Sequence, residues 1–307
     1  MDFVVWPVRF HLVAMESTYF PEGKAANTIR GALGSLLRRF ACVPECTGAK
    51  SCEIARECPY ALLFEPRQEQ ATGGPSGLAD WPRPFVIRAN HLDGLNISSG
   101  RRFHFDVTLF VSPIAALPYL VLSFRELVKA GLGASRARAE LVEVEALSDR
   151  TMVYRDGVFQ NQAVEGLRFD MAASEPLGQR IAIRFLTPTE LKCEGAVVTR
   201  LEFGIFFRRL RDRISNLRSL YQGGPLEIDF EESGRRADEI RLIDDKVHRV
   251  NVERLSSRTR QKHPIGGIVG DVEYEGDLSG FASYLRVGEW VGVGRQTVWG
   301  KGQFSIL

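Results

Sequence analysis

The sequence repeats one order of apolar patterns in its two halves, and this repeat limits the folds open to it. In the first half, apolar periodicity predicts strands at 8–14, 84–88, 101–111 and 137–146, and helices at 24–40 and 114–130. In the second half, it predicts strands at 180–186, 239–254, 266–274 and after residue 302, and helices at 201–221 and 278–287. Each half follows a βαββαβ order. We therefore expect an α+β chain of two tandem ferredoxin-like (RRM-like) domains, at residues 1–170 and 178–307.

Composition excludes few functions by itself. The 307 residues suit about two domains. Apolar residues make up 44% and charged residues 25%, as in an ordinary globular protein, and the formal charge of +2 implies no partner. No apolar run is long enough to span a bilayer, and Asp2, Trp6 and Arg9 interrupt the N-terminal segment in a way unlike a signal peptide. We expect a cytoplasmic protein with no membrane partner.

A glycine-rich stretch near the C-terminus predicts a loop that binds phosphate. Its residues of interest are Gly292, Gly294, Arg295, Trp299, Gly300, Lys301 and Gly302. Glycine lets backbone N–H groups approach an anion, the two cations add charge, and the indole offers a face on which a base can stack. The spacing fits neither a Walker loop nor a dinucleotide fingerprint, because both open a helix and here a short strand follows. A polymeric phosphate ligand fits better; the alternative is an ordinary β-hairpin.

A second basic segment runs from residue 254 to 264 and contains no acidic residue. Its cations are Arg254, Arg258, Arg260 and Lys262, and it also carries His263. These side chains and their small polar neighbours suit contacts with phosphate and ribose. The alternative is a solvated loop.

Four of the five cysteines lie close together in the sequence. Cys42, Cys46, Cys52 and Cys58 have the spacing C-x3-C-x5-C-x5-C, whereas Cys193 stands alone and is expected at a strand end. In a cytoplasmic chain such a cluster favours metal over disulfides. We expect a structural zinc ion held by these four residues; free thiols, an iron–sulfur cluster and disulfides are the alternatives, because the C-x2-C pairs of a zinc ribbon are absent.

Together these motifs resemble a known family, the CRISPR-associated endoribonucleases of the RAMP superfamily that cut precursor CRISPR RNA within its repeats. The similar segments are 31–34 (GALG), the cysteine cluster ending in 60–65 (YALLFE), 185–189 (FLTPT), 257–262, 266–276 and the terminal glycine-rich loop. The resemblance runs almost from end to end. It is most specific in the block 258–276 and in the terminal loop.

The resemblance implies two ferredoxin-like domains with RNA bound along them and contacted by the glycine-rich loop. It implies cleavage without a catalytic cofactor, through attack of a ribose 2′-hydroxyl on the neighbouring phosphate, which leaves a 2′,3′-cyclic phosphate and a 5′-hydroxyl. The cysteine cluster would then be structural. The implied partners are CRISPR repeat RNA and other subunits of a CRISPR effector complex. A non-catalytic RNA-binding subunit of such a complex is the alternative, and a zinc-stabilised interaction module is a third.

The catalytic residues follow the family pattern only in part. Many members have a histidine near the start of the first helix, close to a tyrosine and a lysine. Tyr19 and Lys24 match the last two, but residues 24–40 contain no histidine. His263 is the leading candidate for acid or base catalysis, with RNA contact or no role as alternatives, and His11 is second. A site without histidine would use Tyr19 and Lys24 with Arg295. His91, His104 and His248 are expected at the surface.

Overall fold

The computed structural model describes residues 1–31, 33–43, 45–46, 48–49, 52–66, 81–133, 135–173, 177–255 and 261–307. It divides into two compact units. The first unit is Val4–Leu167; the second unit joins Met1–Phe3 to Arg168–Leu307. The N-terminal residues belong to the second unit because the Met171 amide donates to the Met1 carbonyl (2.9 Å). In the described part of the chain, no helix has the length and hydrophobicity of a membrane span.

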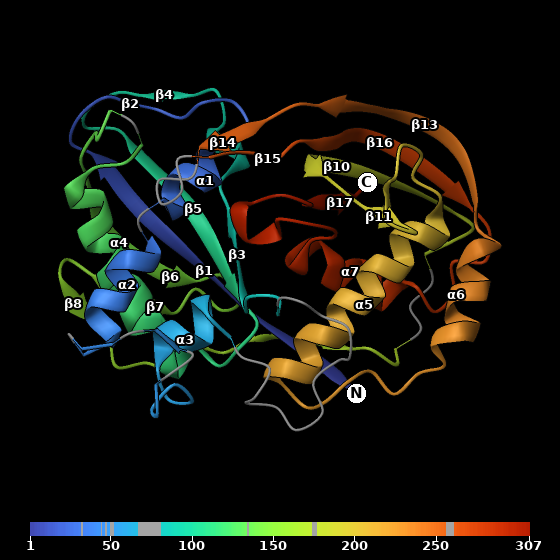
Figure 1. Cartoon of the computed structure of the whole chain (residues 1–307), viewed down its shortest axis with the longest axis horizontal. Helices are drawn as coiled ribbons and strands as arrows, with labels where there is room; N and C mark the ends of the chain where they lie inside the picture. Colours follow the sequence, from blue (N-terminus) through green and yellow to red (C-terminus); the bar gives the residue numbers. More distant parts are fainter. Residues whose placement is uncertain are drawn as a thin grey trace. The chain divides into compact units, whose positions relative to one another are not determined.

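The first unit is built on an antiparallel sheet with the strand order β3-β5-β1-β6 (Figure 1). Its strands are β1 (Asp2–Ala14), β3 (Phe85–Arg88), β5 (Arg102–Leu109) and β6 (Ala139–Ala146). The helices between them are α1 (Ala25–Arg30), α2 (Leu33–Ala41) and α4 (Leu117–Ala130). The order along the chain is therefore βαββαβ, as predicted. Shorter strands extend or flank this sheet: β7 (Met152–Arg155), β8 (Val158–Phe159) and β9 (Leu167–Asp170).

The alternating pattern of β1 explains which face of this sheet is covered. Phe10 of β1 stacks on Phe105 of β5 with ring centres 5.0 Å apart, and Phe124 of α4 packs edge-on against Phe10 at 4.9 Å. All three rings are fully buried. The intervening β1 residues point to the opposite face, where Arg9 pairs with Asp106 (2.7 Å). Successive side chains of a strand point to opposite faces of the sheet, so one face of β1 forms the core and the other carries polar groups.

The prediction of a single helix at 24–40 is wrong in one respect, because the segment forms two helices. α1 ends at Arg30, Gly31 adopts φ −27° and ψ −82°, and α2 begins at Leu33. Glycine interrupts a helix at low steric cost. Gly34 lies against the Phe64 ring of α3 (Pro59–Phe64), and a Cβ atom there would lie 3.0 Å from the ring. The absence of a side chain at Gly34 therefore allows α2 to approach the Phe64 ring closely.

The second unit repeats the plan with the strand order β13-β16-β10-β17. Its strands are β10 (Arg180–Thr189), β13 (Arg241–Val250), β16 (Gly267–Glu275) and β17 (Phe304–Ile306), and its two crossing helices are α5 (Phe203–Tyr221) and α7 (Ala282–Val291) (Figure 1). Both sheets place their strands in the order second, third, first, fourth, which defines the ferredoxin-like fold. The tandem prediction is therefore confirmed.

Several short elements were not predicted. They are the pairs β2 (Thr18–Tyr19) with β4 (Asn96–Ile97), β11 (Lys192–Cys193) with β12 (Ala196–Val197), and β14 (Glu253–Leu255) with β15 (Lys262–Pro264), together with helix α6 (Phe230–Asp238). Two or three residues carry too little periodicity to be recognised as a strand. Cys193 lies at the end of β11, as expected.

The core of the second unit is aromatic. Phe203, Phe206 and Phe207 of α5 are buried, and Phe206 packs edge-on against Phe185 of β10 (5.6 Å) and Phe304 of β17 (5.2 Å). Aromatic pairs in this geometry add to the free energy gained by burial. This packing fixes β17 beside β10, so the segment that joins α7 to β17 must pass over the end of β10.

Candidate nucleic-acid interface

The glycine-rich loop joins α7 to β17 and is attached to the end of β10 by its main chain. The Arg295 amide donates to the Glu190 carbonyl (3.1 Å), and the Gly302 amide donates to the Pro188 carbonyl (3.1 Å). The loop also closes on itself, because the Val293 amide donates to the Gly302 carbonyl (2.8 Å). A short 3-10 helix, η5 (Thr297–Trp299), lies between these attachments. The loop is therefore an ordered part of the second unit.

We expected the backbone amides of the four loop glycines to face a ligand, but three of them donate to backbone carbonyls of the protein. Gly292 donates to Gly288 (2.8 Å), Gly300 to Thr297 (3.0 Å) and Gly302 to Pro188. These N–H groups are used by the fold and cannot cradle a phosphate in this conformation. The glycine at 302 serves close packing instead, since a Cβ atom there would lie 1.9 Å from the Val293 carbonyl oxygen. Among the described residues, the Gly294 amide has no backbone acceptor.

The two cations of the loop have different positions. Arg295 is 56% exposed and pairs with Glu190 (2.8 Å), whose carboxylate is nearly buried. Lys301 is only 3% exposed. In this position Lys301 does not present its side chain to a ligand, so the predicted RNA contact is better supported for Arg295 than for Lys301. Burial of Lys301 follows from the short path between η5 and β17, which the sequence pattern does not reveal.

The described ends of the basic segment 254–264 lie in two short antiparallel strands, β14 and β15, which contact the glycine-rich loop. Arg254 of β14 lies opposite His263 of β15. The Arg254 guanidinium stacks over the Trp299 ring, 3.9 Å from its centre, and the Gln296 side-chain amide (Nε2) donates to the Pro264 carbonyl (2.9 Å). Burial lowers the pKa of Arg254. One face of Trp299 is therefore covered by an arginine, and only the remainder of the ring is left for a base.

We call Arg254, Lys262, His263, Arg295 and Trp299 the loop–hairpin surface. Lys262 is exposed and lies 3.6 Å from Glu253 on the opposite strand, and His263 is half-buried. Arg258 and Arg260, which we expected to bind RNA, lie outside the described residues. The structure thus brings together two motifs that the sequence presented separately.

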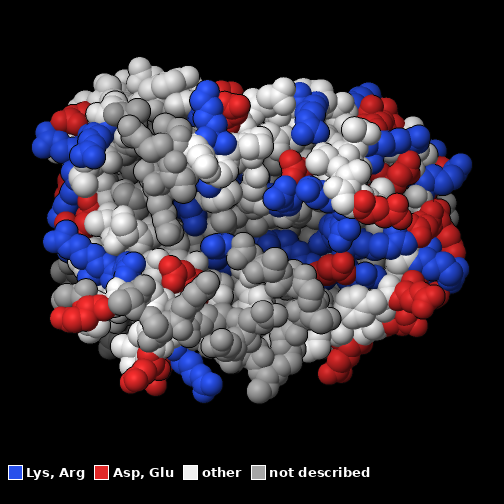
Figure 2. All heavy atoms as spheres, in the orientation of Figure 1, with Lys and Arg blue, Asp and Glu red and all other residues white. Residues whose placement is uncertain are grey.

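The arginines of α5 are mostly engaged by the protein itself. Arg208 pairs with Asp238, and Arg218 donates to the carbonyls of Gly224 and Pro225. Arg213 donates to the Val291 carbonyl (3.0 Å) at the end of α7, and burial lowers its pKa to about 10. Figure 2 shows basic and acidic side chains interleaved over the region where Figure 1 draws α6. This basic tract is therefore largely structural.

Tyr19 and Lys24 belong to the first unit. Tyr19 ends β2 and is 56% exposed. Lys24 precedes α1, whose first amide, that of Ala25, donates to the Asp93 carboxylate (2.8 Å). The aspartate fixes the start of α1 and thereby the backbone of Lys24. His263 belongs to the second unit, so the three predicted catalytic residues come from both units.

Three histidines of the first unit form a row that the sequence reading missed. The His91 and His104 rings stack with centres 4.4 Å apart, and the His104 and His11 rings are 6.1 Å apart. His11 contacts Glu145 (2.9 Å). Burial lowers the pKa of His104, and the nearby Arg9 guanidinium lowers it further. The pairing of β1 with β5 sets His11 opposite His104. The sequence does not give this strand register, so it could not predict that the histidines lie together.

The cysteine cluster lies between α2 and α3. The Cys42 and Cys58 sulfurs are 3.8 Å apart, and Cys52 packs against the same group of residues. Burial raises the pKa of the Cys42 thiol to about 12, whereas a hydrogen bond from the Gly48 amide lowers that of Cys46. Within the described residues, no three potential ligands already stand in a geometry that would hold a metal ion.

Comparison with known proteins agrees with this architecture. Residues 183–304 match the family model described as CRISPR-associated endoribonuclease Cas6, and residues 3–166, more than half of the chain, match the AF_1859_N model, described as an N-terminal domain. No curated protein matches in sequence.

Similar solved structures cover nearly the whole chain. They include "Cas6 (TTHB231) product complex", a Thermus thermophilus protein (TM-score 0.56, 15% identity), and "Cas6 (TTHA0078) product complex" (0.53, 16%), each matched over 99% of both chains. "Partial Cas6-RT-Cas1--Cas2 complex" has a TM-score of 0.58 and 11% identity over 99% of this chain and 46% of that one. At such identities, likeness to a structure shows the fold alone.

Two ferredoxin-like units, of which the second matches an endoribonuclease family model, define an RNA-processing protein. Residues 183–304 carry the domain of the CRISPR-associated Cas6 endoribonucleases, and the protein is an RNA-cleaving enzyme.

The seating of the loop can be tested with two glycines of similar backbone conformation. Gly302 (φ +71°) has the Val293 carbonyl in the path of a Cβ atom, whereas Gly178 (φ +73°) has open space. We expect Gly178→Ala to lower the free energy of unfolding by about 1–2 kcal/mol, the cost of left-handed backbone. Gly302→Ala should lower the free energy of unfolding by ~1–3 kcal/mol more than Gly178→Ala does, because the added methyl group overpacks the site. Urea denaturation measures both, and equal losses would contradict the close seating.

Proposed function

We propose that this enzyme cuts precursor CRISPR RNA within its repeats and uses no metal ion in the reaction. The 2′-oxygen of the nucleotide before the cut attacks the adjacent phosphorus as the bond from phosphorus to the 5′-oxygen breaks. The products are a 2′,3′-cyclic phosphate and a 5′-hydroxyl. A base must take the 2′-hydroxyl proton and an acid must protonate the leaving oxygen, while cations stabilise the phosphorane. The RNA and the other CRISPR components are intracellular, so we place the activity in the cytoplasm.

The observation that carries this proposal is the loop–hairpin surface. It contains three cations, Arg254, Lys262 and Arg295, with one imidazole and one indole in a single unit, and Arg254 stacks on the indole and lies opposite the imidazole-bearing residue. Cations supply most of the affinity for a nucleic-acid backbone, and an aromatic ring adds sequence-tolerant stacking. The ion pair of Arg295 with Glu190 restrains the guanidinium but leaves it 56% exposed, so its remaining N–H groups can donate to a phosphate.

His263 is our candidate for one of the two proton-transfer roles. An imidazole changes charge near neutral pH, which suits it to either role. Its half-buried position opposite Arg254 sets it beside the cations that would hold a phosphate. Tyr19 and Lys24 are the candidates for the other role and for charge stabilisation. This assignment follows the family pattern of a tyrosine and a lysine near the start of the first helix.

The proposed partners are CRISPR repeat RNA and other CRISPR proteins. Among the similar structures, one is a "Cas6 (TTHA0078) substrate mimic complex" and another is a "Cas6-RT-Cas1--Cas2 complex". Those descriptions concern the proteins named in them. For this chain, they support a test with repeat RNA first and a search for co-purifying CRISPR subunits second.

The chemistry can be tested with one repeat RNA and its analogue carrying a deoxyribose at the scissile nucleotide. We expect the RNA to be cut in excess EDTA and to end in a cyclic phosphate. The analogue should bind equally well and stay intact, because it lacks the attacking oxygen. Gel electrophoresis and mass spectrometry of the products give the result. Cleavage of the analogue would contradict 2′-hydroxyl attack, and tight binding without cleavage of either RNA would favour the non-catalytic subunit.

Substitution of His263 separates catalysis from binding. We expect His263→Ala to lower the single-turnover cleavage rate by about 10²–10⁴-fold, as loss of a general acid or base does, with a much smaller change in RNA affinity. His248→Ala is the control, because His248 is an exposed histidine of β13 outside the loop–hairpin surface. Equal losses of rate and affinity would make His263 an RNA contact, and unchanged values would remove it from the site.

Substitution of Arg295 tests the electrostatic role of the loop. We expect Arg295→Ala to weaken RNA binding and to reduce the slope of log affinity against log salt by about 0.7, the value for one contact with single-stranded phosphate. Arg241→Ala removes the same charge from a 73% exposed side chain on β13 and should leave the slope unchanged. Filter binding across a salt series measures both. Identical slopes for the two variants would exclude Arg295 as a phosphate contact.

A further inference from the structure

The four clustered cysteines lie in a segment that has little apolar surface to hold it together. The buried residues at the centre of this cluster are small: Ala49, Ala55, Ala61 and Cys58. Small side chains bury little apolar area and therefore contribute little stabilisation. Such a segment usually needs a further cross-link.

The distance between two of the sulfurs is that of a zinc site. Cys42 Sγ and Cys58 Sγ are 3.8 Å apart. Sulfurs at the corners of a tetrahedron around zinc, each bonded at about 2.3 Å, are about 3.8 Å from one another. A disulfide would need a sulfur separation of only about 2.05 Å. Cys42 and Cys58 thus already span one edge of the tetrahedron.

The other two cysteines lie next to this edge. Cys46 lines the same hollow as Cys42, and Cys52 packs against the group that contains Cys58. Because the described residues do not yet gather three ligands at metal-binding geometry, Cys46 and Cys52 must move to complete the site. Both thiols are only partly buried, so they can turn without breaking a packed core.

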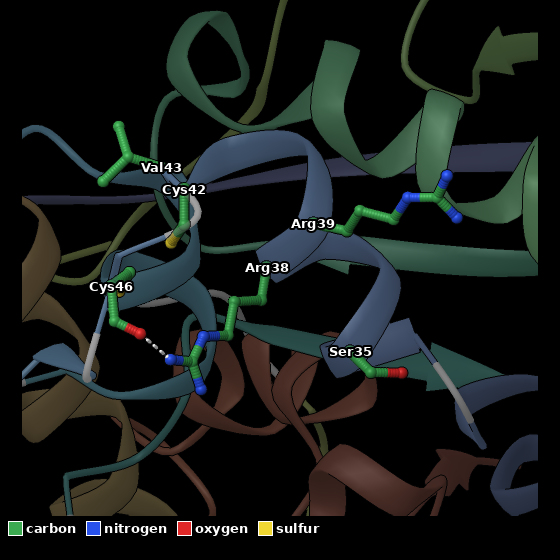
Figure 3. Close-up of a pocket in the computed structure, with 6 residues that line it drawn as sticks. All are labelled: Ser35, Arg38, Arg39, Cys42, Val43 and Cys46. Atoms are coloured by element: carbon green, nitrogen blue, oxygen red, sulfur yellow. Dashed lines mark hydrogen bonds between the residues drawn. The ribbon is translucent and has the colours of Figure 1, made fainter.

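The surroundings also suit a negatively charged metal centre. Four thiolates around Zn²⁺ carry a net charge of −2, and Arg38 lines a hollow of about 440 Å³ together with Cys42 and Cys46, whereas the Arg39 side chain on the same hollow points away from the cysteines (Figure 3). Arg38 donates to the Cys46 carbonyl, and the Gly48 amide donates to Cys46. Donors of this kind orient metal ligands and stabilise their charge.

We propose that Cys42, Cys46, Cys52 and Cys58 bind one structural zinc ion. Binding forms four zinc–sulfur bonds and releases four thiol protons to solvent, with no change of oxidation state. The ion would join the C-terminal end of α2 to the start of α3, the two helices that pack through Gly34 and Phe64. This role is independent of the proposed RNA chemistry.

Metal analysis of the full chain, purified in reducing buffer, tests the site. We expect about one zinc per chain, the content of a single tetrahedral site. A chelator strong enough to remove it should lower the melting temperature, and added Zn²⁺ should restore it. Cobalt in place of zinc should give the intense visible bands of a tetrahedral thiolate complex. Absence of zinc, bound iron in its place, or a disulfide found by mass spectrometry would each overturn the proposal.

Single substitutions locate the ion. Cys42→Ser and Cys58→Ser should each lose the zinc, whereas Cys193→Ser, which changes the cysteine outside the cluster, should keep it. If the first two variants do not fold, the native chain still decides the question. Bound zinc should shield four of its five cysteines from a thiol reagent until a chelator is added. Full reactivity without chelator, or zinc that stays bound in Cys42→Ser, would refute the site.

Discussion

The second unit depends on the main-chain attachment of its glycine-rich loop to the end of β10. Two amides of the loop donate to the carbonyls of Pro188 and Glu190, and within the loop the Val293 carbonyl leaves no room for a side chain at Gly302. The aromatic packing of Phe206 fixes β17 beside β10, so the path available to the loop is short. The loop therefore bends tightly, buries Lys301 and turns Arg295 outward.

This constraint divides the basic residues into two groups. The arginines of α5 donate hydrogen bonds to carboxylates and carbonyls of the second unit, as Arg213 does to the Val291 carbonyl at the end of α7. Arg295 and Lys262 keep exposed head groups, although each has an acidic neighbour. Sequence shows the charge of a residue but not its partners. In an enzyme that must hold a polyanion, the exposed cations Arg295 and Lys262 are available for binding. The arginines of α5, which are hydrogen-bonded within the protein, contribute to its stability instead.

The cysteine cluster and the histidine row of the first unit show two different limits of reading a sequence. The cysteines are close along the chain, so their convergence was expected from spacing, and the structure supplies the sulfur distance. The histidines come from β1, β5 and the short segment before β4, and only strand register and chain reversal bring them together. Local spacing predicts local clusters, whereas contacts across a sheet depend on pairing that no single segment encodes.

The sequence alone determined the fold class, because apolar periods of two and 3.6 residues recur in the same order in both halves and allow few other arrangements. It also pointed to the loop, the hairpin segment and the cysteines, since glycine, arginine and cysteine have distinctive chemistry wherever they lie. Only the tertiary structure decided that Lys301 is buried, that Arg254 covers Trp299, and that helix 24–40 breaks at Gly31. Exposure and stacking depend on neighbours distant in the chain, and these are set by packing.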